Sequence, residues 1–322
     1  MKISVAIAAY CGEKYIIEQL ESLLEQKRLP DEVLIGDDSP GMTVAEKVSL
    51  FKRSHPILPF TLKYNKNPYT KGVNANFHSL ACDCSGDIIF FCDQDDVWLP
   101  DKIKILAGQI ENDPALEAVC CFSFFTDADL EPWEKQDRRE LAALNAISPE
   151  RLFYLFSKNA ICGAGHNIAI RKTLLSQLPL WDGFFLYDSW ILRSCAACGT
   201  LLFIRERLTL HRVHANNFTK HAEVNFKKTV AMRMKNNGTA ELTRLLKEWQ
   251  LFEKNIKASS LKENILPPNE KMLNDNISFL EKRLLCRSSS LFLRTFYCLI
   301  LLPDYFFFGN GWRSAVRDFF RL

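Results

Sequence analysis

The stretch Ile88–Trp98, IIFFCDQDDVW, decides the fold because it joins an apolar run to a cluster of carboxylates. Ile88–Cys92 is continuously apolar, which is typical of a parallel strand covered on both faces. Asp93–Asp96 then brings three carboxylates together, and they repel one another unless a cation lies between them. In open α/β sheets, ligands bind at the carboxyl ends of strands. The stretch therefore predicts a strand end that holds a divalent cation; a solvated acidic turn is the alternative.

Strand and helix signals alternate on both sides of this stretch. Apolar runs predict strands at 3–8, 31–36, 60–64, 87–92 and 118–125, and helical spacing predicts helices at 16–24, 44–54, 73–82 and from Pro100. A second acidic strand end, Asp37-Asp38-Ser39, follows the second of these strands. Further on, we expect a helix at 187–198 and a strand at 201–204. This alternation indicates a doubly wound, mostly parallel α/β sheet.

The composition excludes some classes of protein. The 322 residues are 48% hydrophobic and 25% charged, as in ordinary globular proteins, and the net charge of +3 is too mild to indicate a nucleic-acid partner. Met1–Val5 leads directly into a strand, without the pattern of a secretory signal peptide. The eleven cysteines are scattered and odd in number. We therefore expect reduced thiols and a cytoplasmic location.

The pattern changes to helices only beyond about His221, which predicts a sheet domain at 1–220 and a helical extension at 221–322. Leu291–Phe308 is strongly apolar, but Arg294, Pro303 and Asp304 interrupt it. It is shorter than the roughly 20 apolar residues that a spanning helix needs. Its aromatic residues and flanking arginines favour a helix in a membrane interface. A helix packed on the sheet domain and a homodimer contact are the alternatives.

Four motifs resemble, in their order, those of family 2 inverting glycosyltransferases of the GT-A fold: Ala8-Ala9-Tyr10, Asp37-Asp38-Ser39, Gly72–Phe77 and Asp93–Trp98. The resemblance runs from Met1 to about Thr219, and the DQDDVW form is similar to the rhamnosyltransferase-like branch that builds bacterial surface polysaccharides. It implies a Rossmann-like nucleotide-binding half and Mg²⁺- or Mn²⁺-dependent sugar transfer from a nucleotide diphosphate donor. The favoured donor is dTDP-rhamnose, or else a UDP-hexose. The implied acceptor is a lipid-linked saccharide on the cytoplasmic face of the inner membrane.

The resemblance also implies roles for individual residues. Nucleotide binding falls to Ala8, Tyr10, Asp37, Asp38, Asp93 and Arg212; the metal to Asp95, Asp93 and His214; and the vicinity of donor sugar and acceptor to Asp96, Gly163 and Trp190. His214 matches the metal position better than His211. Asp188, at the start of a predicted helix, matches the catalytic base, which takes the proton of the attacking hydroxyl and so accelerates transfer by about 10²–10⁴-fold. Tyr187 stands where relatives often carry His or Glu.

Two other functions remain open at this stage. A nucleotidyltransferase also uses paired carboxylates, Mg²⁺ and a nucleotide, but it would need a basic glycine-rich loop after the first strand, and Ala8–Gly12 has no such pattern. A non-catalytic nucleotide-sugar-binding protein would have no need of the acidic motifs.

Overall fold

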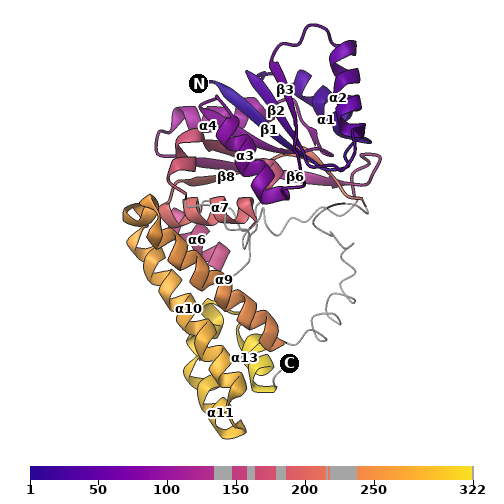
Figure 1. Ribbon diagram of the computed structural model, residues 1–322. Helices are drawn as coiled ribbons and strands as arrows, with labels where there is room; N and C mark the ends of the chain where they lie inside the picture. The colour runs from indigo at the N-terminus through magenta and orange to yellow at the C-terminus, as the bar shows by residue number, and fades with distance from the viewer. Residues whose placement is uncertain (134–146, 158–163, 179–185, 215–216, 218–237, 321–322) are drawn as a thin grey trace. The chain divides into compact units, whose positions relative to one another are not determined.

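A computed structural model describes residues 1–133, 147–157, 164–178, 186–214, 217 and 238–320 (Figure 1). The chain divides into two compact units. The sheet unit comprises Met1–Pro149 and Cys162–Asn216, and the helical unit comprises Glu150–Ile161 and Asn217–Leu322. The chain thus enters the helical unit twice. The boundary expected between residues 220 and 221 lies outside the described residues.

The sheet unit is built on one mixed sheet of eight strands in the order β3-β2-β1-β4-β7-β6-β8-β5. The strands are β1 (Ile3–Ala9), β2 (Glu32–Asp37), β3 (Thr61–Lys66), β4 (Ile88–Asp93), β5 (Val97–Trp98), β6 (Ala118–Thr126), β7 (Ile168–Arg171) and β8 (Leu201–Arg212). The first four are parallel to one another, whereas β7 runs antiparallel to its neighbours β4 and β6. The mostly parallel α/β sheet that the sequence predicts is confirmed.

Helices cover both faces of this sheet. The apolar sides of α1 (Ile16–Leu24), α2 (Thr43–Ser54) and α4 (Lys102–Asn112) share one core cluster with Phe90 of β4. The next residue, Phe91, points to the other face, where its ring meets Phe77 of α3 (Val73–Asp83) and Tyr187 of α7 (Tyr187–Cys198). Both phenylalanines are fully buried. This two-sided burial is why β4 is apolar throughout instead of alternating.

The register of the parallel strands brings the predicted motifs to one edge. Ala9, the last residue of β1, pairs with Asp37, the last residue of β2. On the other side of β1, Ala8 pairs with Asp93, which ends β4. The two acidic strand ends are therefore separated only by β1, at the carboxyl edge of the sheet.

The far half of the sheet departs from the sequence prediction. The strand expected at 201–204 continues to Arg212 as β8, because the charged segment Arg205–Arg207 remains on the strand instead of ending it. Register shifts between β6 and β8 occur near Phe122. Because of this extension, His211 and Arg212 are the last residues of a strand and pair with Phe125 and Thr126. The short strand β5 and the helix α6 (Pro149–Ser157) were not predicted.

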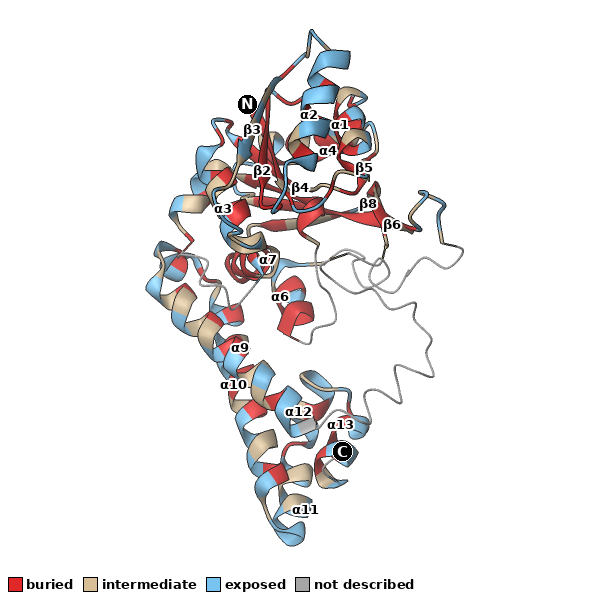
Figure 2. Cartoon of the chain, turned by 45° about the vertical axis from the view of Figure 1, so that its right-hand side comes forward, coloured by how far each residue is buried: buried red, intermediate tan, exposed pale blue. Residues whose placement is uncertain are grey.

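The helical unit consists, in its described residues, of α6, a short 3-10 turn at 260–264 and five further helices (Figures 1 and 2). These are α9 (Gly238–Ala258), α10 (Pro267–Ser288), α11 (Leu291–Ile300), α12 (Leu302–Phe307) and α13 (Trp312–Phe320). Phe153 of α6 packs its ring against Trp249 and Phe252 of α9. Pro267 and Pro268 form the first turn of α10, where a missing N–H costs nothing. Among the described residues, no helix is both long and apolar enough to span a membrane.

Candidate active site

The first acidic strand end is satisfied within the chain. Asp37 is fully buried, and its carboxylate accepts hydrogen bonds from the Ser39 backbone N–H at 2.8 Å and from the Tyr64 hydroxyl at 2.6 Å. Lys66 Nζ lies 3.2 Å from the same carboxylate, and the Ser39 hydroxyl also donates to it. Asp37, predicted to bind the nucleotide, is thus the centre of a closed local network. Its contacts shape the loop after β2.

Asp38 holds the start of α3. One carboxylate oxygen accepts from Asn67 Nδ2 at 2.7 Å, and the other accepts from the backbone N–H of Gly72 at 2.8 Å. Gly72 has φ +84°, which a glycine adopts without strain. A carboxylate has about four acceptor positions, so Asp38 can accept a further bond from a nucleoside base. The predicted role of Asp38 is compatible with these contacts.

The loop after β1 is clamped by Gln94. The Tyr10 backbone N–H donates to Gln94 Oε1 at 2.8 Å, and Gln94 Nε2 donates to the Tyr10 carbonyl at 2.9 Å. Both backbone groups of Tyr10 that could have met a nucleoside are therefore occupied by the second acidic motif, while the Tyr10 side chain is exposed. Ala8 lies one position inside the sheet edge, between β2 and β4. The clamp ties the predicted nucleoside loop to the predicted metal motif.

The carboxylates at the end of β4 point in different directions. Asp93 is partly exposed, Asp95 reaches His214, whose Nε2 lies 2.9 Å from Asp95 Oδ2, and Asp96 is fully buried. Asp96 Oδ1 lies 2.9 Å from His211 Nδ1 and accepts the Arg212 backbone N–H at 3.1 Å. Of the predicted metal group, Asp95 and His214 are thus in direct contact.

Two stacked histidines lie beneath this group. The rings of His166 and His211 are parallel within 9°, with centroids 4.5 Å apart. His166 Nδ1 lies 3.3 Å from Asp93 Oδ2 and 3.5 Å from Asp96 Oδ2. The potential ligand atoms of Asp96, His166 and His211 all lie within 4.8 Å of one another. Neither histidine was predicted as part of the site. For His166, the sequence signal would have been its place in a glycine-rich turn directly before a strand.

The arginine at the end of β8 supports the acidic motif from inside. Arg212 is buried, and its Nε donates to the Asp95 carbonyl at 2.8 Å. Its other nitrogens bond to the Ala128 carbonyl and the Glu18 carboxylate, and its guanidinium lies 4.4 Å from the centre of the Tyr15 ring. Arg212, predicted to contact a diphosphate, makes these contacts within the chain. Arg212 holds the backbone of the carboxylate cluster.

The electrostatics of the cluster favour a bound cation. Burial, followed by the charges of Asp96 and Asp93, raises the pKa of Asp95 to about 8. Burial would also raise the pKa of Asp96, but the neighbouring His166 and His211 outweigh it and hold that pKa below its usual range. Asp96 Oδ2 is buried and accepts no hydrogen bond from the described residues. Crowded carboxylates with an unfilled oxygen, beside imidazole nitrogens, fit a divalent ion such as Mg²⁺ or Mn²⁺.

Two histidine environments differ in charge. Burial alone would lower the pKa of His211, but the charge of Asp96 and its hydrogen bond raise it to about 9. Burial and the charge of Arg212 lower the pKa of His214. A metal ligand must be a neutral imidazole. His214 meets that condition near neutral pH, so it is better suited than His211 to bind a cation with Asp95.

The predicted base lies at the start of α7. Asp188 Oδ2 accepts the Gly165 backbone N–H at 3.1 Å, and Oδ1 accepts the backbone N–H of Ser189 at 2.6 Å. Burial, which outweighs these bonds, raises the pKa of Asp188 to about 6. A Cβ at Gly165 would lie 1.7 Å from the Tyr187 hydroxyl, so only glycine fits this turn. Trp190 is buried on α7, and Gly163 lies outside the described residues.

One short turn, η1 (Gly165–Asn167), therefore joins the predicted base, Asp188, to the acidic cluster. Gly165 contacts Asp188, and the next residue, His166, contacts Asp93 and Asp96. Asn167 anchors the turn in the core, because its side chain donates to Ser123 Oγ at 2.8 Å and accepts from Thr209 Oγ1 at 2.7 Å.

A fully buried lysine completes this anchor. Lys102 Nζ donates to the His166 carbonyl at 2.6 Å and to Thr209 Oγ1 at 2.7 Å, and it lies 3.9 Å from the centre of the Trp98 ring. Burial lowers its pKa. The sequence prediction missed Lys102, although a lysine beside the apolar stripe of α4 was a visible signal.

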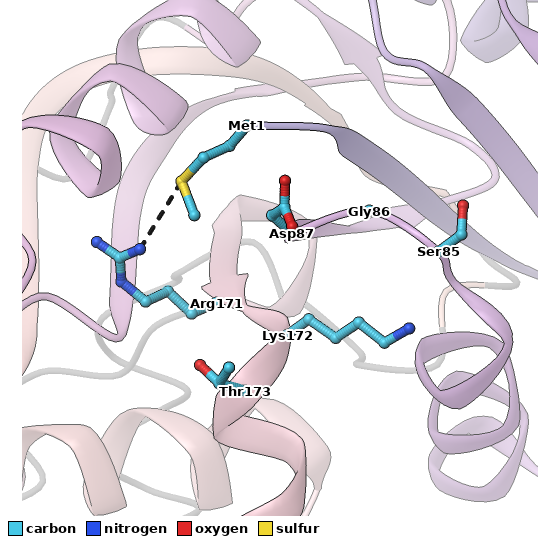
Figure 3. A pocket seen from close by; sticks show the side chains of 7 residues that line it. All are labelled: Met1, Ser85, Gly86, Asp87, Arg171, Lys172 and Thr173. Atoms are coloured by element: carbon cyan, nitrogen blue, oxygen red, sulfur yellow. Dashed lines mark hydrogen bonds between the residues drawn. The ribbon is translucent and has the colours of Figure 1, made fainter.

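A cavity of about 410 Å³ lies away from these residues (Figure 3). Its lining, Met1, Ser85–Asp87 and Arg171–Thr173, precedes β1 and β4 or follows β7, which places it at the opposite edge of the sheet. Arg171 Nε donates to the Leu116 carbonyl at 2.7 Å, and Lys172 Nζ donates to the Cys84 carbonyl. Both cationic side chains of the cavity are thus engaged with the backbone.

Comparison with known proteins agrees with this geometry. The model of the family "Glycosyl transferase family 2" matches residues 4–178, more than half of the chain. The chain belongs to glycosyl transferase family 2. The family resemblance of the four sequence motifs is confirmed.

Individual relatives match only part of the chain. The chain is 37% identical over 105 residues to the dTDP-rhamnosyl transferase RfbG of Shigella flexneri, a match that covers 30% of this chain and 34% of that protein. It is 28% identical over 103 residues to the UDP-Glc:alpha-D-GlcNAc-diphosphoundecaprenol beta-1,3-glucosyltransferase WfgD of Escherichia coli, covering 32% and 38%. These matches span little more than a third of each relative.

The fold has counterparts among solved structures. The mannosyltransferase PcManGT of Pyrobaculum calidifontis, solved with GDP-Man and Mn²⁺, superimposes with a TM-score of 0.55 at 17% identity, covering 98% of this chain and 85% of that one. At this identity the likeness concerns the fold alone. It confirms the predicted GT-A type of sheet with helices in the C-terminal part.

Proposed function

We propose that this protein is a metal-dependent inverting glycosyltransferase that moves one sugar from a nucleotide diphosphate donor to a saccharide acceptor. One observation carries the proposal. The turn η1 holds a partly buried carboxylate, Asp188, next to a cluster of crowded carboxylates in which burial and like charges raise the pKa of Asp95. The first feature suits a general base, and the second suits the cation and diphosphate of a leaving group.

In the proposed reaction, the acceptor hydroxyl oxygen attacks the anomeric carbon of the donor sugar. The bond from that carbon to the diphosphate oxygen breaks, and the nucleoside diphosphate leaves with the bonding electron pair. Asp188 takes the hydroxyl proton. Its pKa of about 6 leaves it ionised at neutral pH while keeping it basic enough to accept a proton. An in-line attack of this kind inverts the configuration of the sugar carbon.

We assign the cation to Asp93, Asp95 and His214. When bound there, Mg²⁺ or Mn²⁺ would neutralise charge that develops on the diphosphate. The buried group of Asp96, His166 and His211 is less suitable, because Asp96 Oδ1 already accepts two hydrogen bonds and all three side chains are closed to solvent. A cation that also touches a diphosphate must be reachable from outside. Asp93, with 37% of its side chain exposed, supplies that access.

The nucleoside is assigned to the loops after β1 and β2. Asp38 would accept from the base, and Gln94 would keep the Tyr10 loop next to the metal motif. Asp37 supports this pocket through Tyr64 and Lys66. In this assignment, Ala8 and Asp96 lie beneath the substrate rather than in contact with it.

The favoured donor is dTDP-rhamnose, with a UDP-hexose as the second choice. The relative RfbG, named as a dTDP-rhamnosyl transferase, supports the first, and WfgD, named for UDP-glucose, supports the second. WfgD is also named for an acceptor linked to diphosphoundecaprenol, a lipid. By this analogy we propose a lipid-linked saccharide acceptor of bacterial surface polysaccharide synthesis. The enzyme would then work on the cytoplasmic face of a membrane.

Calorimetry with dTDP and UDP, with and without Mn²⁺, tests the site. We expect nucleotide binding that requires the metal and that Asp95→Ala abolishes. Binding that is indifferent both to Mn²⁺ and to this substitution would contradict the assignment. A panel of nucleotide sugars, screened for slow donor hydrolysis by the full-length protein, then identifies the sugar.

A further inference from the structure

The last helix that the structure describes, α13, is packed with its polar side inward. On α13, Ser314, Ala315 and Asp318 are buried, whereas Trp312, Val316 and Phe320 are exposed by 60%, 39% and 62%. The exposed three recur at every fourth position and therefore form one stripe along the helix. Helices of soluble proteins turn such a stripe toward the core. The apolar stripe of α13 instead faces outward.

The buried side of α13 is held by charges. Asp318 is fully buried and accepts from Arg283 Nε and Arg287 Nε, each at 2.6 Å, and from the Tyr305 hydroxyl at 2.7 Å. These bonds join α13 to α10 and α12. Since a buried carboxylate with three donors fixes the rotation of its helix, the outward position of Trp312 is built into the fold.

Helix α11 shows the same property more strongly. None of its ten residues is buried, although Leu291, Phe292, Leu293, Phe296, Leu299 and Ile300 are all large apolar side chains. Phe292 is 82% exposed. Figures 1 and 2 show α11 and α13 in the same part of the helical unit, with much of α11 drawn as exposed. Exposed apolar surface of this extent marks a binding face.

The exposed charges on α11–α13 are arginines. From residue 291 to residue 320, all of which the structure describes, the exposed charged residues are Arg313 and Arg317, whereas Arg294 and Asp304 are half-buried. On α10, the exposed neighbours Glu281 and Lys282 have opposite charges. Arg313 and Arg317 directly follow Trp312 and Val316, so they flank the apolar stripe. A symmetric dimer through this face would bring identical cations together, because such an interface pairs each patch with itself. Anionic lipid headgroups would neutralise them instead.

We propose that α11–α13 form a docking face that lies in the interface of an anionic lipid bilayer. Phe292, Phe296, Trp312 and Phe320 enter the boundary of the acyl chains, and Arg313 and Arg317 contact the headgroups. The face lies on the surface and does not span the membrane, in keeping with the short helices. This inference deepens the proposed membrane location by naming the surface responsible, and it needs no catalytic step.

Vesicle flotation of the full-length protein, without donor or acceptor, tests the docking face. Flotation is chosen because aggregated protein does not rise with the vesicles. We expect the wild type to rise with vesicles of phosphatidylglycerol and phosphatidylcholine, and the double variant Phe292→Asp/Trp312→Asp to lose at least about tenfold in binding. Arg313→Gln/Arg317→Gln should lose the preference for anionic vesicles, by about fivefold per arginine at low salt.

The matched control is Ile57→Asp. Ile57 lies in the sheet unit and is 91% exposed. The substitution therefore changes an exposed apolar side chain outside the docking face, and vesicle binding should remain as in the wild type. Circular dichroism melting checks that each variant is folded. Sedimentation equilibrium tests whether a second copy of the chain covers the face instead. If the wild type forms a dimer that Trp312→Asp dissociates, and if it does not bind vesicles, the proposal is overturned in favour of a second copy.

Two further outcomes would overturn it. One is a wild type that floats with neither kind of vesicle, and the other is a folded double variant that floats as well as the wild type. Transfer to a soluble acceptor is measured separately. Loss of vesicle binding with normal transfer concerns the docking face alone, whereas loss of transfer in every variant and in the wild type concerns the proposed activity.

Discussion

The ends of β2 and β4 carry the same sequence signal, adjacent aspartates after an apolar strand, but the structure completes only one of them. Asp37 receives a lysine, a tyrosine and two donors from Ser39. By contrast, burial and acidic neighbours raise the pKa of Asp95 to about 8, and Asp96 keeps a buried oxygen that accepts no hydrogen bond from the described residues. The chain supplies a lysine at the first strand end, whereas the partners of Asp93 and Asp95 at the second are the imidazoles of His166 and His214.

This difference separates a structural carboxylate from a binding one. A carboxylate whose partners all come from the chain contributes to folding, and its removal should lower stability. One that is crowded by like charges opposes folding until a ligand arrives, and its removal should abolish binding while leaving the fold intact. Sequence motifs alone do not distinguish the two cases.

The largest expected effect comes from the incomplete end. Asp95→Asn should lower sugar transfer by about 10³-fold, since stabilisation of the leaving diphosphate is lost. Binding of Mn²⁺, followed by electron paramagnetic resonance, should weaken in parallel, and His214→Gln should weaken it as well. The metal-free variant should unfold in no less urea than the wild type, because an amide at this position avoids the burial and like-charge crowding that raise the pKa of Asp95. A destabilised variant with normal Mn²⁺ binding would break the comparison.

The next effect concerns the base. Asp188→Asn should lower kcat by at least about 10²-fold, because the amide cannot take the hydroxyl proton. Nucleotide and Mn²⁺ affinity should stay within about twofold of the wild type, which calorimetry measures. Ser189→Ala is the matched control: it changes the side chain of the next residue on α7 but keeps the backbone N–H that Asp188 accepts. Near-normal turnover in Asp188→Asn would move the base to another residue.

A substitution at the end of β2, where Asp37 has its partners within the chain, should instead lower the stability of the protein. Asp37→Asn removes the charge that Lys66 and Tyr64 face, and we expect the free energy of unfolding to fall by about 2 kcal/mol. Urea denaturation monitored by circular dichroism measures it. The fall should be the same with and without Mn²⁺. If Mn²⁺ affinity drops as far as in Asp95→Asn, the two strand ends do not differ in the way described.

The smallest effect is a pH dependence. Burial, opposed by the hydrogen bonds from Ser189 and Gly165, raises the pKa of Asp188 to about 6, and only the ionised form can act as a base. Transfer at saturating metal and nucleotide sugar should therefore fall about tenfold per pH unit below pH 6 and level off above it. A rate that stays constant from pH 7 to pH 5 would show that the step which limits turnover does not involve this carboxylate.

Much of the fold could be read from the sequence because it depends on local patterns. The runs at 3–8, 31–36 and 87–92 became β1, β2 and β4, and the aspartates after them met at one edge, as parallel strands require. The extent of β8 could not be read in this way. Its charged middle resembles a loop, and only pairing with β6, 80 or so residues earlier, keeps it extended.

The site was predictable in its motifs and not in its partners. Asp95, Asp188 and His214 stand in recognisable patterns. The partners that decide their roles come from distant segments: Tyr64 and Lys66 for Asp37, the Asp95 carbonyl and Glu18 for Arg212, and Lys102 for the His166 turn. The sequence predicts Arg212 as a ligand contact because an arginine near a predicted diphosphate site suits phosphate oxygens. Its burial, which depends on Ala128 and Tyr15, carries no sequence signature.

The interleaved course of the chain has a consequence for the order in which the protein is made. During synthesis the ribosome delivers β1 to β6 first, then α6 of the helical unit, and only afterwards β7, α7 and β8. The sheet therefore cannot be completed until α6 of the helical unit has been synthesised. The cluster around Asp95 likewise lacks His214 until about two thirds of the chain has been synthesised. Early products of translation would carry the acidic motif without its imidazole partner.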